Sequence, residues 1–237
     1  METLSSLICA ENLTKTFGWQ RALREVTFTV GRGACLALLG ANGSGKTTLM
    51  RILAGLSRPT SGKATVGGWA IPQEAAHVRP NIGFIGHQTL LYDDLTALEN
   101  LLFYATLYGV PRSDAERRAA DLLGRVGLGR RATDRAGTFS RGMGQRLALA
   151  RALMHDPAVL LFDEPYTGLD PSGAAFLDTL IAEWRGAGKT ILLTLHDLTR
   201  AAALCEGALI LKSGRLVAEV AAGGMMTLPA RFAEVTG

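Results

Sequence analysis

The segment that most constrains this chain is Gly40–Thr47, whose sequence GANGSGKT fits the pattern G-x-x-x-x-G-K-[ST]. The apolar run 34–39 before it is typical of a strand buried on both faces, and 47–54 after it has apolar positions at helical spacing. A glycine-rich turn between a strand and a helix directs backbone N–H groups and a helix N-terminus at one anion. The segment therefore predicts a phosphate-binding loop, since a chance match has a probability of roughly one in a hundred.

Composition predicts an ordinary globular chain. Of its 237 residues 48% are hydrophobic and 19% charged, with no low-complexity segment or internal repeat. Such a chain buries roughly 70–75% of its unfolded surface, so it needs no disulfides to fold. The three cysteines, Cys9, Cys35 and Cys205, are widely spaced and form no C-x-x-C, which predicts buried thiols in a reducing compartment. No apolar run reaches the ~18 residues of a membrane span, and the N-terminus has no secretory pattern, so we expect a cytosolic chain.

Positive charge is concentrated in one stretch. The net charge is +4, and ten arginines but only four acidic residues lie between residues 112 and 151. The usual explanation is a solvated helical face. The alternative is a lobe that lies near an anionic membrane or an acidic partner.

The N-terminal third alternates in the manner of strands. Residues 7–13 and 22–30 predict two strands, and the turn 16–19 between them carries two aromatics that we expect to be exposed, Phe17 and Trp19. An aromatic there could stack on a nucleobase or could simply pack, and the residues alone do not separate these interpretations. Two further short strands are expected at 63–68 and 81–86, and the second leads to Gln88.

Helical patterns then interrupt this alternation. Helices are expected at 98–109 and 113–126, the second opened by a capping box of Ser113 and Glu116. A glycine-rich turn leads into a further helix at 147–153, which creates a second helix N-terminus suited to an anion. We therefore expect residues 1–89 and 156–237 to form the core and about 90–155 to form an inserted helical lobe.

Polar residues follow the apolar strands of the C-terminal half. The run 158–162 ends at Asp163 and Glu164, and the run 189–195 ends at His196. In such a pair one carboxylate can bind a metal ion while the other orients or deprotonates a water molecule. Ligands of an open parallel sheet bind beyond the carboxyl ends of its strands. The phosphate loop, Gln88, the two acids and His196 are therefore expected at one edge of one sheet.

Taken together, these motifs resemble the nucleotide-binding subunit of an ATP-binding cassette (ABC) transporter over nearly the whole chain. Gly40–Thr47 matches the Walker A loop, 159–163 Walker B, Gln88 the Q-loop, Leu169-Asp170 the D-loop and His196 the switch histidine. The resemblance implies an α/β fold: a P-loop NTPase with a mainly parallel central sheet, a small antiparallel β-layer and an inserted α-helical lobe. Residues 1–237 would form one ABC ATPase domain.

The resemblance also implies a ligand and roles. The ligand is ATP with Mg²⁺, and the chain would be an ATPase. In the catalytic set, Lys46 would contact the β- and γ-phosphates, Glu164 the attacking water and His196 the γ-phosphate. Gln88 completes the set; it would contact the metal ion and sense the membrane partner. The metal set is Thr47, Gln88 and Asp163. The nucleotide-binding set is Phe17 (a tyrosine in most members), Gly40, Ala41, Asn42, Gly43, Ser44, Gly45, Lys46, Thr47, Thr48, Ser140, Gly142 and Asp170.

The segment Ser140–Arg146 resembles the family's signature motif with two departures. Arg141 replaces a glycine and Met143 replaces a glutamine, whereas Ser140 and Gly142 are retained, so we expect a working site. A cation at a helix N-terminus is unfavourable by ~0.3–1 kcal/mol unless an anion lies opposite. Our hypothesis is that Arg141 gains from a neighbouring γ-phosphate.

Family membership further implies an assembly. Two nucleotide-binding subunits, identical or different, would enclose ATP head to tail and dock on separate transmembrane permease subunits at the cytoplasmic face of the membrane; no nucleic acid partner is expected. Soluble ABC ATPases of translation or DNA repair are an alternative, but the chain has neither two cassettes nor a long coiled coil. A module that only binds ATP is disfavoured by Glu164. For the cargo, 86–101 and 139–143 resemble the haem-exporter ATPase of cytochrome c maturation, with drug or polysaccharide export as alternatives.

Overall fold

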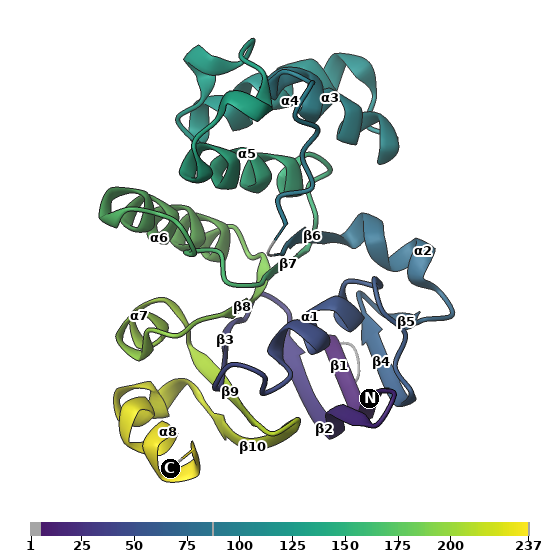
Figure 1. Cartoon of the computed structure of the whole chain (residues 1–237), viewed down its shortest axis with the longest axis vertical. Helices are drawn as coiled ribbons and strands as arrows, with labels where there is room; N and C mark the ends of the chain where they lie inside the picture. Colours follow the sequence, from purple (N-terminus) through teal and green to yellow (C-terminus); the bar gives the residue numbers. More distant parts are fainter. Residues whose placement is uncertain (1–5, 87, 237) are drawn as a thin grey trace. The chain divides into compact units, whose positions relative to one another are not determined.

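The computed structural model describes residues 6–86 and 88–236 and divides the chain into two compact units (Figure 1). The first, here called the core unit, comprises Met1–Phe84, Ala158–Glu164 and Asp178–Gly237. The second, the helical unit, comprises Ile85–Pro157 and Pro165–Leu177. Each unit is described by itself.

A six-stranded sheet in the order β10-β9-β3-β8-β7-β6 forms the centre of the core unit. Its strands are β3 (Cys35–Leu39), β6 (Ile82–Ile85), β7 (Val159–Phe162), β8 (Thr190–Thr194), β9 (Gly207–Lys212) and β10 (Arg215–Val220). β8 pairs in parallel with β3 and β7, and β9 pairs in parallel with β3, whereas β10 is antiparallel to β9. The carboxyl ends of β3, β7 and β8 therefore share one edge of the sheet.

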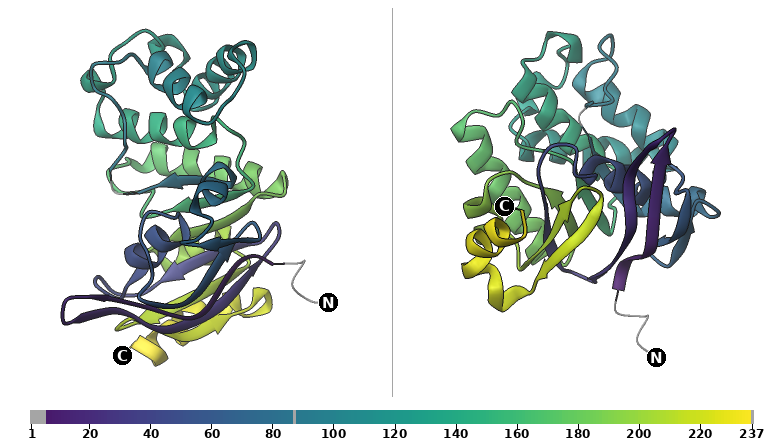
Figure 2. Two further views of the ribbon diagram at one scale, coloured as in Figure 1. Left: turned by 90° about the vertical axis from the view of Figure 1, so that its right-hand side faces the viewer. Right: turned by 60° about the horizontal axis from the view of Figure 1, so that its bottom comes forward.

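A four-stranded antiparallel sheet in the order β2-β1-β4-β5 forms the second layer. Its strands are β1 (Ser6–Phe17), β2 (Gln20–Gly31), β4 (Ser61–Val66) and β5 (Trp69–Ile71). β1 and β2 form the long hairpin coloured purple in Figure 2. β4 passes so close to β1 that a Cβ on Gly62, which has φ +84°, would lie 2.3 Å from the Asn12 carbonyl oxygen. The two sheets confirm the predicted fold class.

Helix α1 joins these layers. The helices of the core unit are α1 (Lys46–Leu53), α2 (Ala75–Val78), α7 (Leu198–Leu204) and α8 (Leu228–Thr236), with short 3₁₀ turns η1 (Arg79–Asn81) and η4 (Ala222–Thr227). Leu49, Met50, Ile52 and Leu53 of α1 are fully buried in one apolar cluster with side chains from both sheets. At about 1.5–3 kcal/mol for each large apolar side chain, this burial fixes α1 and the loop before it.

The helical unit contains α3 (Ala97–Leu107), α4 (Arg112–Arg125), α5 (Arg141–Leu153), η2 (Gly129–Arg131) and η3 (Ala136–Thr138), and α6 (Pro171–Gly186) begins in it. Helices α3, α4 and α5 contact one another. A buried Asn100 fixes the segment before α3, because its Nδ2 donates to the carbonyls of Tyr92, Leu95 and Thr96 and its Oδ1 accepts the Tyr92 N–H.

The predicted capping box on α4 is wrong. Helix α4 starts at Arg112, directly after Pro111, and no side chain caps it. Pro111 already has a fixed φ near the helical value, so the helix begins before Ser113 can act as its cap. Glu116 instead pairs with Arg112 at 3.2 Å. A capping box does exist one helix earlier, where Thr96 and Glu99 exchange side-chain and backbone hydrogen bonds at the start of α3.

Many of the arginines in the helical unit have acidic partners. The exposed pairs are Arg112–Glu116, Arg117–Asp114, Arg118–Asp156 and Arg131–Asp134, at 2.9–3.2 Å. Such pairs contribute at most about 1 kcal/mol each, because water screens them. They favour the interpretation of a solvated helical face over that of a free basic surface.

The cysteines are free thiols. Cys35 and Cys205 are buried with their Sγ atoms 3.8 Å apart, and the contact with Cys35 together with burial raises the pKa of Cys205. Cys9 is only partly buried. Within residues 6–86 and 88–236, no helix has the length and apolarity that crossing a bilayer requires.

Candidate nucleotide-binding site

The phosphate loop connects β3 to α1 through backbone conformations that require glycine. Gly40, Gly43 and Gly45 have φ of +147°, +78° and +109°. A Cβ on Gly40 would lie 2.3 Å from the Leu211 carbonyl oxygen, and one on Gly45 would lie 2.6 Å from that of Ala22. The loop therefore passes against the backbone of its neighbours, which leaves no space for side chains on its inner face.

Polar groups of this loop fit an anionic ligand. The N-cap of α1 is Gly45, which has no side chain to satisfy the first N–H groups of the helix. The Ser44 hydroxyl is buried and has no hydrogen-bond partner in the described part of the chain. Unsatisfied donors at a helix N-terminus, with a buried hydroxyl beside them, are the groups that phosphate oxygens satisfy.

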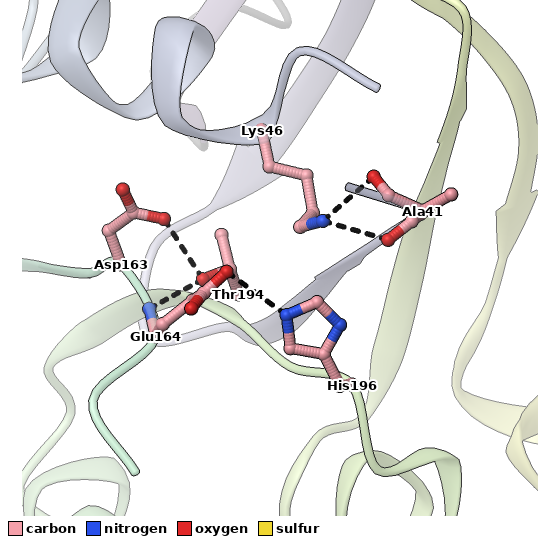
Figure 3. Close-up of polar contacts among 7 residues, drawn as sticks. Ala41, Lys46, Asp163, Glu164, Thr194 and His196 are labelled. Atoms are coloured by element: carbon pink, nitrogen blue, oxygen red, sulfur yellow. Dashed lines mark hydrogen bonds and ion pairs between the residues drawn. The ribbon is translucent and has the colours of Figure 1, made fainter. Parts of the chain in front are cut away.

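Lys46 is a buried cation beside this loop. Its side chain is 5% exposed, and its Nζ donates to the carbonyls of Gly40 at 2.7 Å and Ala41 at 3.1 Å (Figure 3). Burial lowers the pKa of Lys46, whereas the charges of Glu164 and Asp163 raise it. Two carbonyl dipoles compensate an ammonium less well than an anion does, so this residue favours a phosphate in the pocket.

A hydroxyl group connects the two acids that follow β7. Thr194, fully buried at the end of β8, accepts the Glu164 backbone N–H at 2.6 Å and donates to Asp163 Oδ1 at 3.1 Å. Asp163 is itself 3% exposed. One side chain thus fixes both the orientation of the Asp163 carboxylate and the backbone position of Glu164.

Glu164 and His196 face each other. The Glu164 backbone has φ +53°. Residues other than glycine rarely adopt this conformation, and where they do it is often at a functional site. Glu164 Oε1 lies 3.0 Å from His196 Nε2, and both side chains reach solvent (Figure 3). A solvent-accessible carboxylate oriented by a histidine can accept a proton from a bound water.

One pocket of about 680 Å³ contains Lys46 and Glu164 together with two aromatic side chains. It is lined by Phe17, Trp19, Gln20, Arg21, Ala22, Arg24, Asn42, Gly43, Gly45, Lys46, Thr47, Thr48, Glu164 and Ser213. Phe17 is 54% exposed, and the Lys15 ammonium lies 4.7 Å from its ring centroid. The volume of the pocket is typical of a small-ligand site, and its lining offers aromatic rings for a base and a cation for a polyphosphate.

The other predicted residues lie in the helical unit. Gln88 is exposed, three residues beyond β6. Ser140 is the N-cap of α5 and accepts the Met143 N–H at 3.3 Å, and Gly142 lies in the first turn. Asp170 Oδ1 accepts the Gly173 N–H at 2.8 Å, which caps α6. These residues are described only within their own unit.

Arg141 has a contact that its sequence position does not reveal. A Cβ on Gly168 would lie 2.5 Å from Arg141 Cδ and Nε, so the arginine stem lies directly over the Gly168 backbone. Gly168 has φ +82° and lies in the segment that leads to α6. The departure from the signature pattern is thus accommodated by a glycine within the helical unit.

A family model for the ABC transporter matches residues 23–167, more than half of the chain. The chain belongs to the ABC transporter family. It is 40% identical over 198 residues to the ABC transporter ATP-binding protein NatA of Bacillus subtilis (strain 168), which covers 83% of this chain and 80% of that protein. It is 36% identical to the linearmycin resistance ATP-binding protein LnrL of the same organism, over 90% of this chain and 68% of the relative.

Solved ABC structures agree with this assignment. The dimeric post-hydrolysis structure of the cassette MJ0796, bound to ADP and Pi, has a TM-score of 0.83 at 29% identity and covers 91% of this chain and 98% of that one. The structure of an ATP-binding subunit of an ABC transporter has a TM-score of 0.86 at 31% identity, over 98% and 95%. The chain is thus an ATP-binding subunit of the ABC type and an ATPase, as the sequence predicts.

Sequence reasoning missed Thr194, which contacts both acids, and several residues that line the pocket: Gln20, Arg21, Ala22, Arg24 and Ser213. Thr194 interrupts the apolar run Ile191-Leu192-Leu193, and a buried hydroxyl near a strand's carboxyl end was the available signal. Trp19, predicted as an exposed aromatic of the turn, is fully exposed and lines the pocket.

We expect replacement of Thr194 by valine to slow ATP hydrolysis at least about tenfold while ATP affinity stays nearly unchanged. The isosteric change leaves the Glu164 N–H and the Asp163 carboxylate without their shared partner, and 1.4 kcal/mol in barrier height is tenfold in rate. Steady-state ATPase kinetics measure kcat and KM, and urea unfolding measures stability.

Thr190→Val is the matched control. Thr190 is a fully buried threonine of the same strand whose Oγ1 accepts the Gly33 N–H at 2.8 Å, remote from the acids. Both variants should lose about 1–3 kcal/mol of stability. Equal kcat losses in the two variants would show that Thr194 has no special role in catalysis.

Proposed function

We propose that this chain is the ATP-hydrolysing subunit of an exporter whose membrane-spanning subunits are separate chains, attached peripherally at the cytoplasmic face of the membrane. The observation that carries the proposal is the single pocket that contains Phe17, Lys46, Thr47 and Glu164. A nucleotide would extend through it from the aromatic ring to the carboxylate. No nucleic acid partner is proposed.

Contacts within the site support the proposed role of each residue. Lys46 neutralises the β- and γ-phosphates, and the loop N–H groups of Gly40–Thr48 bind their oxygens. Glu164 accepts a proton from the attacking water. His196 orients the Glu164 carboxylate and contacts the γ-phosphate. Fixing and neutralising the transferred group is most of the catalytic task in phosphoryl transfer.

Oxygen ligands suit Mg²⁺ at this site. Thr47 and the buried carboxylate of Asp163 are hard oxygen donors, with Gln88 as a proposed third ligand. Among the described residues no group of three or more His, Cys, Asp or Glu side chains could hold a metal ion. This fits Mg²⁺, which keeps waters and phosphate oxygens among its ligands. When bound, it would neutralise charge on the phosphates.

The proposed active assembly is a head-to-tail dimer, homomeric or heteromeric. Ser140, Gly142 and Asp170 would contact the nucleotide held by the other subunit, and MJ0796, a structural relative, is a dimer. A missing trans element in phosphoryl transfer can cost 10³–10⁵ in rate, roughly 4–7 kcal/mol. A single subunit is therefore expected to be slow.

The helical unit offers an apolar surface for the permease, here called the α3 patch: Leu90, Tyr92, Phe103 and Leu107, with exposures of 38–63%. Phe103 and Leu107 are one helical turn apart on α3, and the Tyr92 ring meets Phe103 at 4.8 Å. A groove of about 640 Å³ between α3 and α4 adjoins the patch and is lined by Phe103, with Glu99 and Arg112 also lining it. Exposed apolar side chains gathered in this way are typical of a protein interface.

The names of several relatives support an exported cargo. They include proteins named for Nod factor export in Burkholderia lata, for linearmycin resistance and for doxorubicin resistance in Mycobacterium tuberculosis. Haem export stays a second candidate, which rests on the likeness of 86–101 and 139–143; His87, within this segment, lies outside the described residues. The identity of the membrane genes beside this one would separate the cargoes.

Replacing Glu164 by glutamine tests the central proposal. The variant should bind ATP normally, accumulate as a dimer and lose hydrolysis, because the amide cannot accept the proton of the attacking water. Dialysis with ATP, size-exclusion chromatography and phosphate release provide the measurements. Glu206→Gln is the control, since Glu206 has a similarly exposed side chain paired with Arg185. Normal turnover by the Glu164 variant would refute the assigned role.

Replacing Leu107 by aspartate should abolish co-purification with the permease while ATP binding by the isolated subunit stays intact. The new charge would be desolvated in an apolar interface, which is costly. Leu56→Asp is the matched control, because Leu56 is 49% exposed in the core unit. If Leu107→Asp still co-purifies, or Leu56→Asp is lost equally, the α3 patch is not the docking surface.

Arg141→Gly should lower both ATPase activity and ATP-driven dimerisation if the guanidinium faces a γ-phosphate in the dimer. Arg141→Met keeps a stem over Gly168 and removes only the charge. Loss of activity in both variants supports the electrostatic role, whereas full activity in the methionine variant would mean that Arg141 serves only in packing.

A further inference from the structure

Trp19 is a tryptophan with no aromatic or cation–π partner in the described part of the chain. It lies in the two-residue connection of the β1–β2 hairpin, after the last pair, Phe17 with Gln20, and it is 103% exposed. The other two tryptophans have partners: Trp184 is buried against Phe162, and Trp69 stacks on His77 at 4.6 Å. A fully exposed indole leaves a large apolar ring in water, where a ligand can stack on it.

The position of Trp19 indicates what it binds. Trp19 lines the same pocket of about 680 Å³ as Phe17, Lys46 and Thr47. The hairpin thus contributes two aromatic side chains to the same pocket that the phosphate loop lines. A ligand that reached from Lys46 to the hairpin would meet both aromatic rings.

Phe17 by itself offers a base only one free ring face. The Lys15 ammonium lies 4.7 Å from the Phe17 ring centroid and is held there by a 2.7 Å hydrogen bond to the Arg58 carbonyl. A planar base stacked on the free face of Phe17 would leave its own opposite face in water. Trp19 is separated from Phe17 by Gly18 alone. Its indole is therefore the aromatic group that could cover this opposite face of the base.

We propose that Trp19 is a second aromatic wall of the nucleotide site, contacting the base or ribose of the nucleotide that Phe17 stacks on. This rests on the proposed function, since it requires a nucleotide whose phosphates occupy the loop. Stacking requires no fixed hydrogen-bond pattern on the base, so Trp19 adds affinity for the nucleoside part of the ligand and none for its phosphates. The residue is a binding residue with no part in proton transfer.

Two probes separate the base from the phosphates. Mg-ADP contains both parts, whereas inorganic tripolyphosphate occupies the loop alone. Trp19→Ala should weaken ADP binding by about two- to tenfold, the worth of one aromatic pair, and leave tripolyphosphate binding unchanged. Trp19→Phe should recover most of the ADP affinity. Isothermal titration calorimetry measures both, and urea unfolding checks that the variants fold.

Tryptophan emission gives an independent measurement. ADP should quench the emission of the wild-type chain and of the control Trp69→Phe, but not that of Trp19→Phe, and tripolyphosphate should quench none of them. Quenching should be independent of protein concentration, since the contact lies within one subunit.

Several outcomes would overturn the inference. If ADP binds wild type and Trp19→Ala equally, Trp19 does not contact the nucleotide, and the proposed function stands. Quenching that appears only at dimer-forming protein concentrations would assign Trp19 to a second copy of the chain. A response to phosphatidylglycerol vesicles with none to ADP would assign it to a membrane surface. If neither ADP nor tripolyphosphate binds the wild type, the proposed function fails as well.

Discussion

The burial of α1 between the two sheets of the core unit is the constraint on which the nucleotide site depends. Four of its side chains lie in the apolar cluster that also contains residues of β2, β3 and β8. Because the helix cannot shift without opening this cluster, its N-terminus and the loop before it are fixed. Gly40 and Gly45 can then lie against the Leu211 and Ala22 carbonyls, at distances that no other residue tolerates.

The parallel sheet brings the chemical groups together around that fixed loop. β3, β8 and β7 are neighbours in the sheet and end at one edge, so the loop, the two acids and His196 converge although they are far apart in sequence. Apolar strands buried on both faces leave only their last residues free to carry polar groups. Thr194 uses that position to connect two acids through one hydroxyl.

The antiparallel layer adds a different chemistry to the same pocket. Its β1–β2 hairpin brings Phe17 and Trp19 to the pocket, whereas α1 supplies the Lys46 cation and the parallel sheet supplies the Glu164 carboxylate. One sheet therefore provides aromatic rings and the other provides charge. This division explains why the hairpin can carry exposed aromatic residues without weakening the apolar core.

The sequence alone determined the phosphate loop, the apolar strands with their terminal polar residues and the family, because each of these is a local pattern of adjacent residues. It placed a capping box wrongly at Ser113, since Pro111 sets the helix start through a backbone constraint that competes with the capping pattern. Only the tertiary structure decided that Thr194 joins Asp163 to Glu164, that Lys15 covers one face of Phe17 and that Arg141 lies over Gly168. These contacts join residues that are distant in sequence or whose side-chain directions depend on strand register and packing, which a linear pattern does not encode.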